Sequence, residues 1–236
     1  MLETVLILNL KKRVDKWMFA QGALRAHDFD IESNLVHRFL GHDGETYESR
    51  EAVMEAAVAD GFDYFGNYEW MNDKRSIAWC WSWAAIMRKI VEIDKTTMFL
   101  MDDQMPIPGW SYWRFCRLVE DLHDVREEHG ELRVIQLNTG LYPKSDTIVY
   151  PMVGQGIGGS CDFGFILTAA GAQLLLDVQS TPIHNDKGLP WDFPCVDMRR
   201  MCEQKYDFDC TTGVYHMLDH IVTPEHIEFK SDLRDY

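Results

Sequence analysis

Apolar runs and amphipathic stretches alternate along the whole of this 236-residue chain. Apolar runs bounded by polar residues predict buried strands, and apolar positions that recur every three or four residues predict helices. We expect strands at residues 5–10, 35–40, 97–101, 132–137 and 163–167. We expect one helix that ends near residue 27, and others at 50–60, 76–93, 110–128, 169–178 and 191–204. This alternation predicts a single α/β domain, because no linker or repeat divides the chain.

The strand expected at residues 97–101 ends on two adjacent carboxylates, Asp102 and Asp103. Ligands of open α/β sheets bind at the carboxyl ends of the strands. Because adjacent side chains of a strand point to opposite faces, the two acids are expected to have different tasks. One can bind Mg²⁺ or Mn²⁺ and the other a sugar hydroxyl, as a nucleotide diphosphate sugar requires. The alternative is a solvated, acid-rich turn.

Composition limits the partners of this chain. A formal net charge of −15 argues against nucleic acid, because binding of the phosphate backbone needs clustered Lys and Arg. A phosphate-bearing ligand would need a metal ion, a helix N-terminus or a few well-placed arginines. No apolar run approaches the roughly 18 residues of a transmembrane helix, and the N-terminus lacks the features of a signal peptide. Six cysteines form no Cys-x-x-Cys pair, so we expect reduced thiols in a cytoplasmic protein.

Three further patterns carry weaker signals. Residues 154–159, GQGIGG, fit the dinucleotide pattern G-x-G-x-x-G, but a strand rather than a helix is expected to follow, which favours a flexible loop beside an active site. Trp79, Trp81 and Trp83 are typical of a helix that packs in the core. Near the C-terminus, one of three histidines could complete a metal shell begun by Asp103. These histidines are His216, His220 and His226.

A resemblance covers most of the chain. The segments that carry it are VLILNLKKRVDK at 5–16, HRF and HDG within 37–44, SWAAIMRKI at 82–90, FLMDD at 99–103, GFILTAAGA at 164–172 and Val-Asp at 196–197. In this order they resemble the glycosyltransferases with a GT-A fold, most closely the family 25 type of lipopolysaccharide and related glycan assembly. The family's Ser-His is Ser82-Trp83 here, and its Glu-Asp-Asp is Met101-Asp102-Asp103. Donor sugar and acceptor are therefore not inherited with the fold.

The resemblance implies a single GT-A-like domain with a mixed, mostly parallel central sheet flanked by helices. A Rossmann-like half at about 1–105 would bind the nucleotide sugar, and a half at about 106–236 would hold the acceptor and the catalytic groups. The donor-binding residues that it implies are Asn9, Leu10, Arg13, Asp43, Ser82, Met101 and Asp102. Among these, Asp43 would lie near the base or ribose and Asp102 near the ribose or donor sugar. Asp103 would bind the metal that bridges the diphosphate.

The reaction implied is metal-dependent transfer from a nucleotide sugar, UDP-linked, to a glycan or glycoconjugate hydroxyl. If transfer inverts the anomeric centre, an acid must take the proton of that hydroxyl. Asp197 is the first candidate and Asp192 the second, although carboxylates are favoured at a helix start in any case. Two alternatives stay open. One is a metal-dependent phosphohydrolase or nucleotidyltransferase, and the other is a degenerate transferase that binds a nucleotide or glycan without turnover.

Overall fold

The computed structural model describes residues 1–62, 73–137, 148–150, 153–155, 164–180, 212–217 and 222–224. Within these residues eight strands form one sheet, in the order β2-β1-β3-β8-β5-β9-β7-β6. They are β1 (Thr4–Leu10), β2 (Val36–Gly41), β3 (Thr97–Met101), β5 (Val134–Gln136), β6 (Ile148–Tyr150), β7 (Val153–Gln155), β8 (Phe165–Leu167) and β9 (Val214–Met217). Two short strands, β4 (Gln104–Pro106) and β10 (Val222–Pro224), form a separate antiparallel ribbon.

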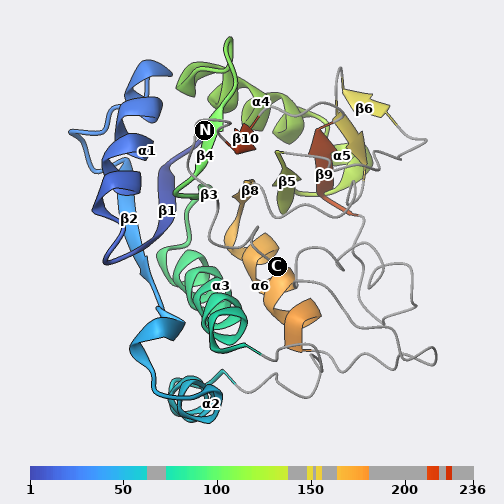
Figure 1. Ribbon diagram of the computed structural model, residues 1–236. Coiled ribbons are helices and arrows are strands. Elements are labelled where there is room, and N and C mark those ends of the chain that lie inside the picture. Colours follow the sequence, from blue (N-terminus) through green and yellow to red (C-terminus); the bar gives the residue numbers. More distant parts are fainter. Residues whose placement is uncertain are drawn as a thin grey trace.

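The sheet is mixed. β1 is parallel to both of its neighbours, β5 is parallel to β9, and β8 and β7 are antiparallel to theirs. Six of the eight described strands therefore run in one direction, so the predicted mixed and mostly parallel α/β sheet is confirmed. Strands from both halves of the chain join in this sheet, with β2, β1 and β3 at one side and β5, β9 and β6 at the other (Figure 1).

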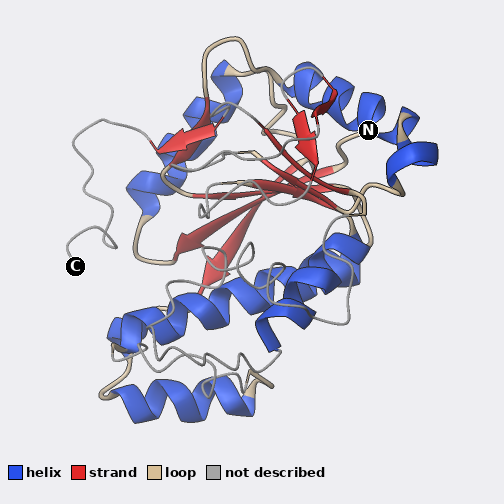
Figure 2. Ribbon diagram, turned by 90° about the vertical axis from the view of Figure 1, so that its right-hand side faces the viewer, coloured by secondary structure: helices blue, strands red, loops and turns tan. Residues whose placement is uncertain are grey.

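Helices cover both faces of the sheet (Figure 2). They are α1 (Val14–Ala26), α2 (Arg50–Ala59), α3 (Lys74–Ile93), α4 (Tyr112–Asp124), α5 (Arg126–His129) and α6 (Ala169–Ser180). β1 illustrates how the sequence builds the two layers. Leu6 and Leu8 join the core beneath α2, α3 and α6, whereas Val5 and Ile7 join the core beneath α1 and α4. Alternate side chains of a strand point to opposite faces, and both faces of β1 are buried.

Most expected elements form within a few residues of the expected bounds, and Ser49 caps α2 by accepting a hydrogen bond from the Ala52 N–H at 3.2 Å. The helix expected at 110–128 is the main difference, because it begins at Tyr112 and divides into α4 and α5 at Val125. No bounds were predicted for the short strands β4, β6, β7, β9 and β10, since three or four residues are too few for a clear pattern. The helix expected at 191–204 lies outside the described residues.

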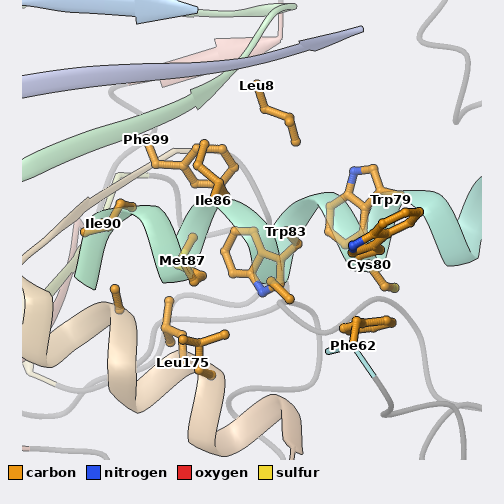
Figure 3. Close-up of a cluster of buried hydrophobic side chains, with 14 of the residues drawn as sticks. Leu8, Phe62, Trp79, Cys80, Trp83, Ile86, Met87, Ile90, Phe99 and Leu175 are labelled. Atoms are coloured by element: carbon orange, nitrogen blue, oxygen red, sulfur yellow. The ribbon is translucent and has the colours of Figure 1, made fainter. Parts of the chain in front are cut away.

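The long helix α3 carries the core of one layer. Figure 3 shows Ile86 and Phe99 on the side toward the sheet, and Met87 and Leu175 on the side toward α6. Trp83 is 1% exposed and packs its ring 5.2 Å from Phe99, between ring centroids. The expected core role of Trp83 is therefore confirmed. In the described part of the chain, no helix is both long and apolar enough to cross a membrane.

Candidate functional site

A cavity of about 310 Å³ lies at the carboxyl ends of β1, β2 and β3. β1 stands between the other two, and the chain leaves it toward β2 through α1 and returns from β2 to β3 through α3. The two helices lie on opposite faces of the sheet. This is a topological switch point, the place where open α/β sheets leave a crevice for ligands.

All seven residues that the sequence predicted for donor binding line this one cavity. They are Asn9, Leu10, Arg13, Asp43, Ser82, Met101 and Asp102. They come from the ends of three strands, from the loop before α1 and from the middle of α3. Segments more than ninety residues apart in sequence, such as those of Asn9 and Asp102, thus meet at one place.

A buried polar network fixes the floor of the cavity. The Asn9 amide donates to the Asp102 carboxylate at 2.5 Å and to the Arg13 carbonyl at 3.0 Å. Its oxygen accepts from Arg38 Nε at 2.7 Å, and Arg38 also donates to the Leu10 carbonyl at 3.0 Å. Arg13 lies 3.4 Å from the second Asp102 oxygen, with only 17% of its side chain exposed. Arg13 therefore faces the cavity and not the solvent surface.

Asp102 is an unusual carboxyl because it is 2% exposed. Burial raises its pKa to about 6, although the Arg13 guanidinium and the Asn9 amide oppose the shift, and the neighbouring Asp103 adds to it. Both of its oxygens are engaged, one by Asn9 and one by Arg13. Asp102 is thus held in one orientation at the end of β3.

Asp103 follows in the turn between β3 and β4, and Gln104 closes this turn by accepting a hydrogen bond from the Met101 N–H at 2.9 Å. Asp103 is partly exposed, has one buried oxygen, and is not among the residues that line the cavity. In the described ranges, no group of three His, Cys, Asp or Glu side chains could hold a metal ion. A metal at Asp103 would therefore need further ligands from the substrate, from water or from other parts of the chain.

The three C-terminal histidines do not add a described ligand. His216 lies fully buried in β9, three strands away from β3 in the sheet order. At about 4.8 Å per strand this is roughly 14 Å, too far for His216 to share an ion with Asp103. His220 and His226 lie outside the described residues, as do Asp192 and Asp197.

Charged side chains surround the mouth of the cavity. Asp43 accepts from the Glu45 N–H at 3.1 Å, which caps the short 3-10 helix Gly44–Thr46, and it pairs with Lys12 at 2.8 Å. Arg75, in the first turn of α3, pairs with Glu45 at 2.9 Å. Lys12, Arg13 and Arg75 thus bring three cations to one cavity of a protein whose formal net charge is −15.

Ser82 has a structural task in this wall. Its hydroxyl donates to the Ala78 carbonyl and accepts from the His42 N–H, both at 2.7 Å. This ties the end of β2 to α3. A Cβ at Gly44 would lie 2.5 Å from the Lys74 carbonyl oxygen, so a larger residue would force the loop away from α3. The close approach of β2 and α3 defines the width of the cavity here.

Aromatic rings form a wall that the sequence did not predict. Trp79 lines the cavity and stacks on Trp83, with ring centroids 6.1 Å apart, so it serves the core and the site together. His42 also lines the cavity, and its ring lies on Trp81 with centroids 3.4 Å apart. The spacing of the tryptophans did indicate part of this arrangement. In a helix, residues 79 and 83 lie on one face, and residue 81 points away from it.

Comparison with protein-family models and with curated protein sequences finds no match to this chain. Residues 156–163, which include most of the glycine pattern at 154–159 and what directly follows it, lie outside the described part, and the next described element is the strand β8. The cavity geometry is therefore the basis for an inference about function.

Proposed function

We propose that this protein is a metal-dependent glycosyltransferase that moves a sugar from a nucleotide diphosphate donor, UDP-linked, to a glycan or glycoconjugate hydroxyl. One observation carries the proposal: the seven residues that the resemblance assigned to the donor line a single cavity at a topological switch point. A GT-A-like arrangement is part of the proposal, and the mixed sheet with three parallel strands at the cavity supports it.

The charges of the cavity suit a diphosphate. A departing nucleoside diphosphate gains negative charge, and fixed cations lower the energy of that state. Arg13 is held by Asp102 on one side and opens to the cavity on the other, while Lys12 and Arg75 stand at the mouth. These three cations are matched by the three carboxylates of the same lining, Asp43, Glu45 and Asp102, so the cavity is locally near neutral within an acidic protein.

The residues present also fit a hard divalent cation. Mg²⁺ usually binds through one or two carboxylates together with substrate phosphates and water, so a full protein cage is not required. Asp103 would be the ligand, because both oxygens of Asp102 are already engaged by Asn9 and Arg13. Bound Mg²⁺ or Mn²⁺ would supply charge neutralisation for the leaving diphosphate. Asp102 would hold Arg13 in place and offer its outer edge to a ribose or sugar hydroxyl.

For an inverting reaction we propose Asp197 as the base and Asp192 as its alternate. Asp197→Asn keeps the shape and removes the basicity, so it should lower turnover by roughly two to four orders of magnitude. Nucleotide affinity, measured by calorimetry, should stay within a few-fold, since the group acts mainly in the transition state. If Asp192→Asn alone shows this pattern, the base is Asp192. Full activity in both variants, with a retained anomeric configuration in the product, would remove the base from the mechanism.

The proposal as a whole is tested with a panel of nucleotide sugars, with and without Mn²⁺. A true donor raises the melting temperature in proportion to its occupancy, and an acceptor screen with that donor should release the nucleoside diphosphate. Release of phosphate or pyrophosphate exchange without a sugar acceptor would favour a phosphohydrolase or nucleotidyltransferase. Donor binding without hydrolysis or transfer would favour a degenerate, binding-only protein. No stabilisation by any nucleotide sugar contradicts the proposal.

A further inference from the structure

The ring of His42 lies almost parallel to that of Trp81, with an angle of 7° and 3.4 Å between centroids. His42 directly follows β2 at the wall of the cavity. None of the sequence patterns assigned a role to this pair. The two rings form a stack, and the ring of His42 borders the cavity.

The stack is held from several sides. Trp81 is 5% exposed, and its indole N–H donates to the Asp60 carboxylate at 2.7 Å. Tyr47 packs against the same indole with centroids 6.4 Å apart. The His42 backbone N–H donates to Ser82 Oγ, which fixes the start of the side chain. The imidazole is therefore presented in a defined plane without a cost of ordering on ligand binding.

The free face of the imidazole is the one toward the cavity. Trp81 covers one face, and Trp81 itself does not line the cavity whereas His42 does. Among the described residues, the ring nitrogens of His42 make no hydrogen bond. Burial lowers the pKa of His42, with Asp60 opposing, and so favours the neutral ring. A flat, uncharged aromatic surface thus faces the ligand space.

The position of His42 relative to the acidic turn indicates which part of a ligand it meets. β2 and β3 are separated by β1, so their ends lie about 10 Å apart. A nucleotide whose diphosphate lies at Arg13, which pairs with Asp102 at the end of β3, would extend its nucleoside end across β1 toward the end of β2. The base, and not the phosphates, would then reach His42.

We propose that His42, backed by Trp81, is the platform on which the nucleobase of the donor stacks. The inference rests on the proposed function and names a binding residue for it. Stacking on an aromatic ring accepts every base, since each base has a π-face. His42 therefore supplies affinity for the nucleoside, and other polar groups of the cavity select among bases.

Calorimetric titration with UDP, CDP, GDP and ADP in the presence of Mn²⁺ tests the platform. With the nucleotide that binds best, His42→Ala should weaken binding by roughly ten- to a hundredfold, the usual effect of losing one base-stacking ring. His42→Phe retains a flat ring on Trp81 and should stay within about threefold of wild type. Inorganic pyrophosphate should bind wild type and His42→Ala equally. His37→Ala, on the exposed part of β2, is the matched control and should change nothing.

Proton NMR gives a readout that a purely structural role would not move. The carbon-bound ring protons of His42 should shift upfield on titration with the nucleotide and stay in place with pyrophosphate, because a stacked base adds its ring current. Equal nucleotide affinity in wild type and His42→Ala overturns the platform while leaving the proposed function intact. An equal loss for nucleotide and pyrophosphate also overturns it, since the effect would then be structural. Failure of every nucleotide to bind wild type overturns both proposals.

Discussion

Two cavities lie at opposite ends of the strands of the sheet, and the charged side chains of the larger one are more exposed. The cavity of about 310 Å³ lies at the carboxyl ends of the first three strands, and one of about 530 Å³ lies near the start of β5 and the end of β8. Both contain arginines and carboxylates. In the larger cavity Asp94, Arg126 and Glu131 are exposed side chains. In the smaller one Asn9 and Asp102 are 1% and 2% exposed and bind each other.

This difference shows that a larger volume does not identify the functional cavity. Exposed charges are well solvated, and ion pairs between them contribute little. A buried carboxylate and amide are costly unless they are held by partners, so their presence together requires a dedicated network. Such a network at a switch point is a stronger sign of function than a larger, solvated hollow. The following variants test that contrast, from the largest expected effect to the smallest.

Asp103→Ala should have the largest effect. Loss of the carboxylate proposed to bind the metal should lower Mn²⁺-dependent turnover at least about a hundredfold, because the leaving diphosphate loses its charge neutralisation. Far-UV circular dichroism should be unchanged, since the side chain is partly exposed. Glu131→Ala, in the larger cavity, is the control and should keep wild-type turnover. Full activity of wild type in EDTA, or of the Asp103 variant, would contradict the metal role.

Asp102 should make stability depend on pH. Its pKa is about 6 in the folded protein against an ordinary value of 3.8, so the folded state binds more protons between these values. The contribution of this group to stability is therefore greatest below about pH 4 and is lost as pH rises through 6, by up to about 3 kcal/mol. Asp102→Asn removes this dependence, so the free energy of unfolding of wild type minus that of the variant should fall by up to about 3 kcal/mol as pH rises over that range. Parallel profiles in metal-free urea titrations would show that Asp102 does not titrate as stated.

Arg13 and Arg133 provide a direct comparison of the two cavities. Arg13→Ala should weaken donor binding and raise the apparent dissociation constant of the donor about ten- to a hundredfold, since a charge-assisted contact to phosphate is worth roughly 1.5 to 3 kcal/mol. The rate at saturating donor should change less. Arg133 borders the larger cavity and donates to the Thr212 carbonyl at 2.7 Å. Arg133→Ala should leave donor affinity within twofold. A larger effect would indicate that the donor binds in the larger cavity, which would contradict the proposed site.

The sequence predicted the framework of the smaller cavity better than its walls. β1 and β3 were clear because both of their faces are buried, which gives long apolar runs, and the resemblance placed donor residues at their ends. The His42–Trp81 stack could not be predicted, because it joins residues thirty-nine positions apart on different elements. Arg75 enters the site only through the packing of α3 on the loop at Gly44. The strands β6 and β7 are three residues each, and too short for a periodic signal.

The burial of Lys16 was also not predicted, and a variant at this position has the smallest expected effect. It lies on the buried face of α1, 6% exposed, and within the described residues its ammonium has no hydrogen-bond partner. Asn9 and Asp102 are buried with partners, so Lys16 is the opposite case. Lys16→Met keeps the unbranched stem and removes the charge. It should raise the free energy of unfolding by about 1 to 2 kcal/mol, the cost of an unsatisfied buried polar group.

Lys12→Met, at an exposed ion pair, is the control and should stay within about 0.5 kcal/mol in urea unfolding. Lower stability of Lys16→Met than of wild type would contradict the prediction that the buried ammonium is a cost to the fold.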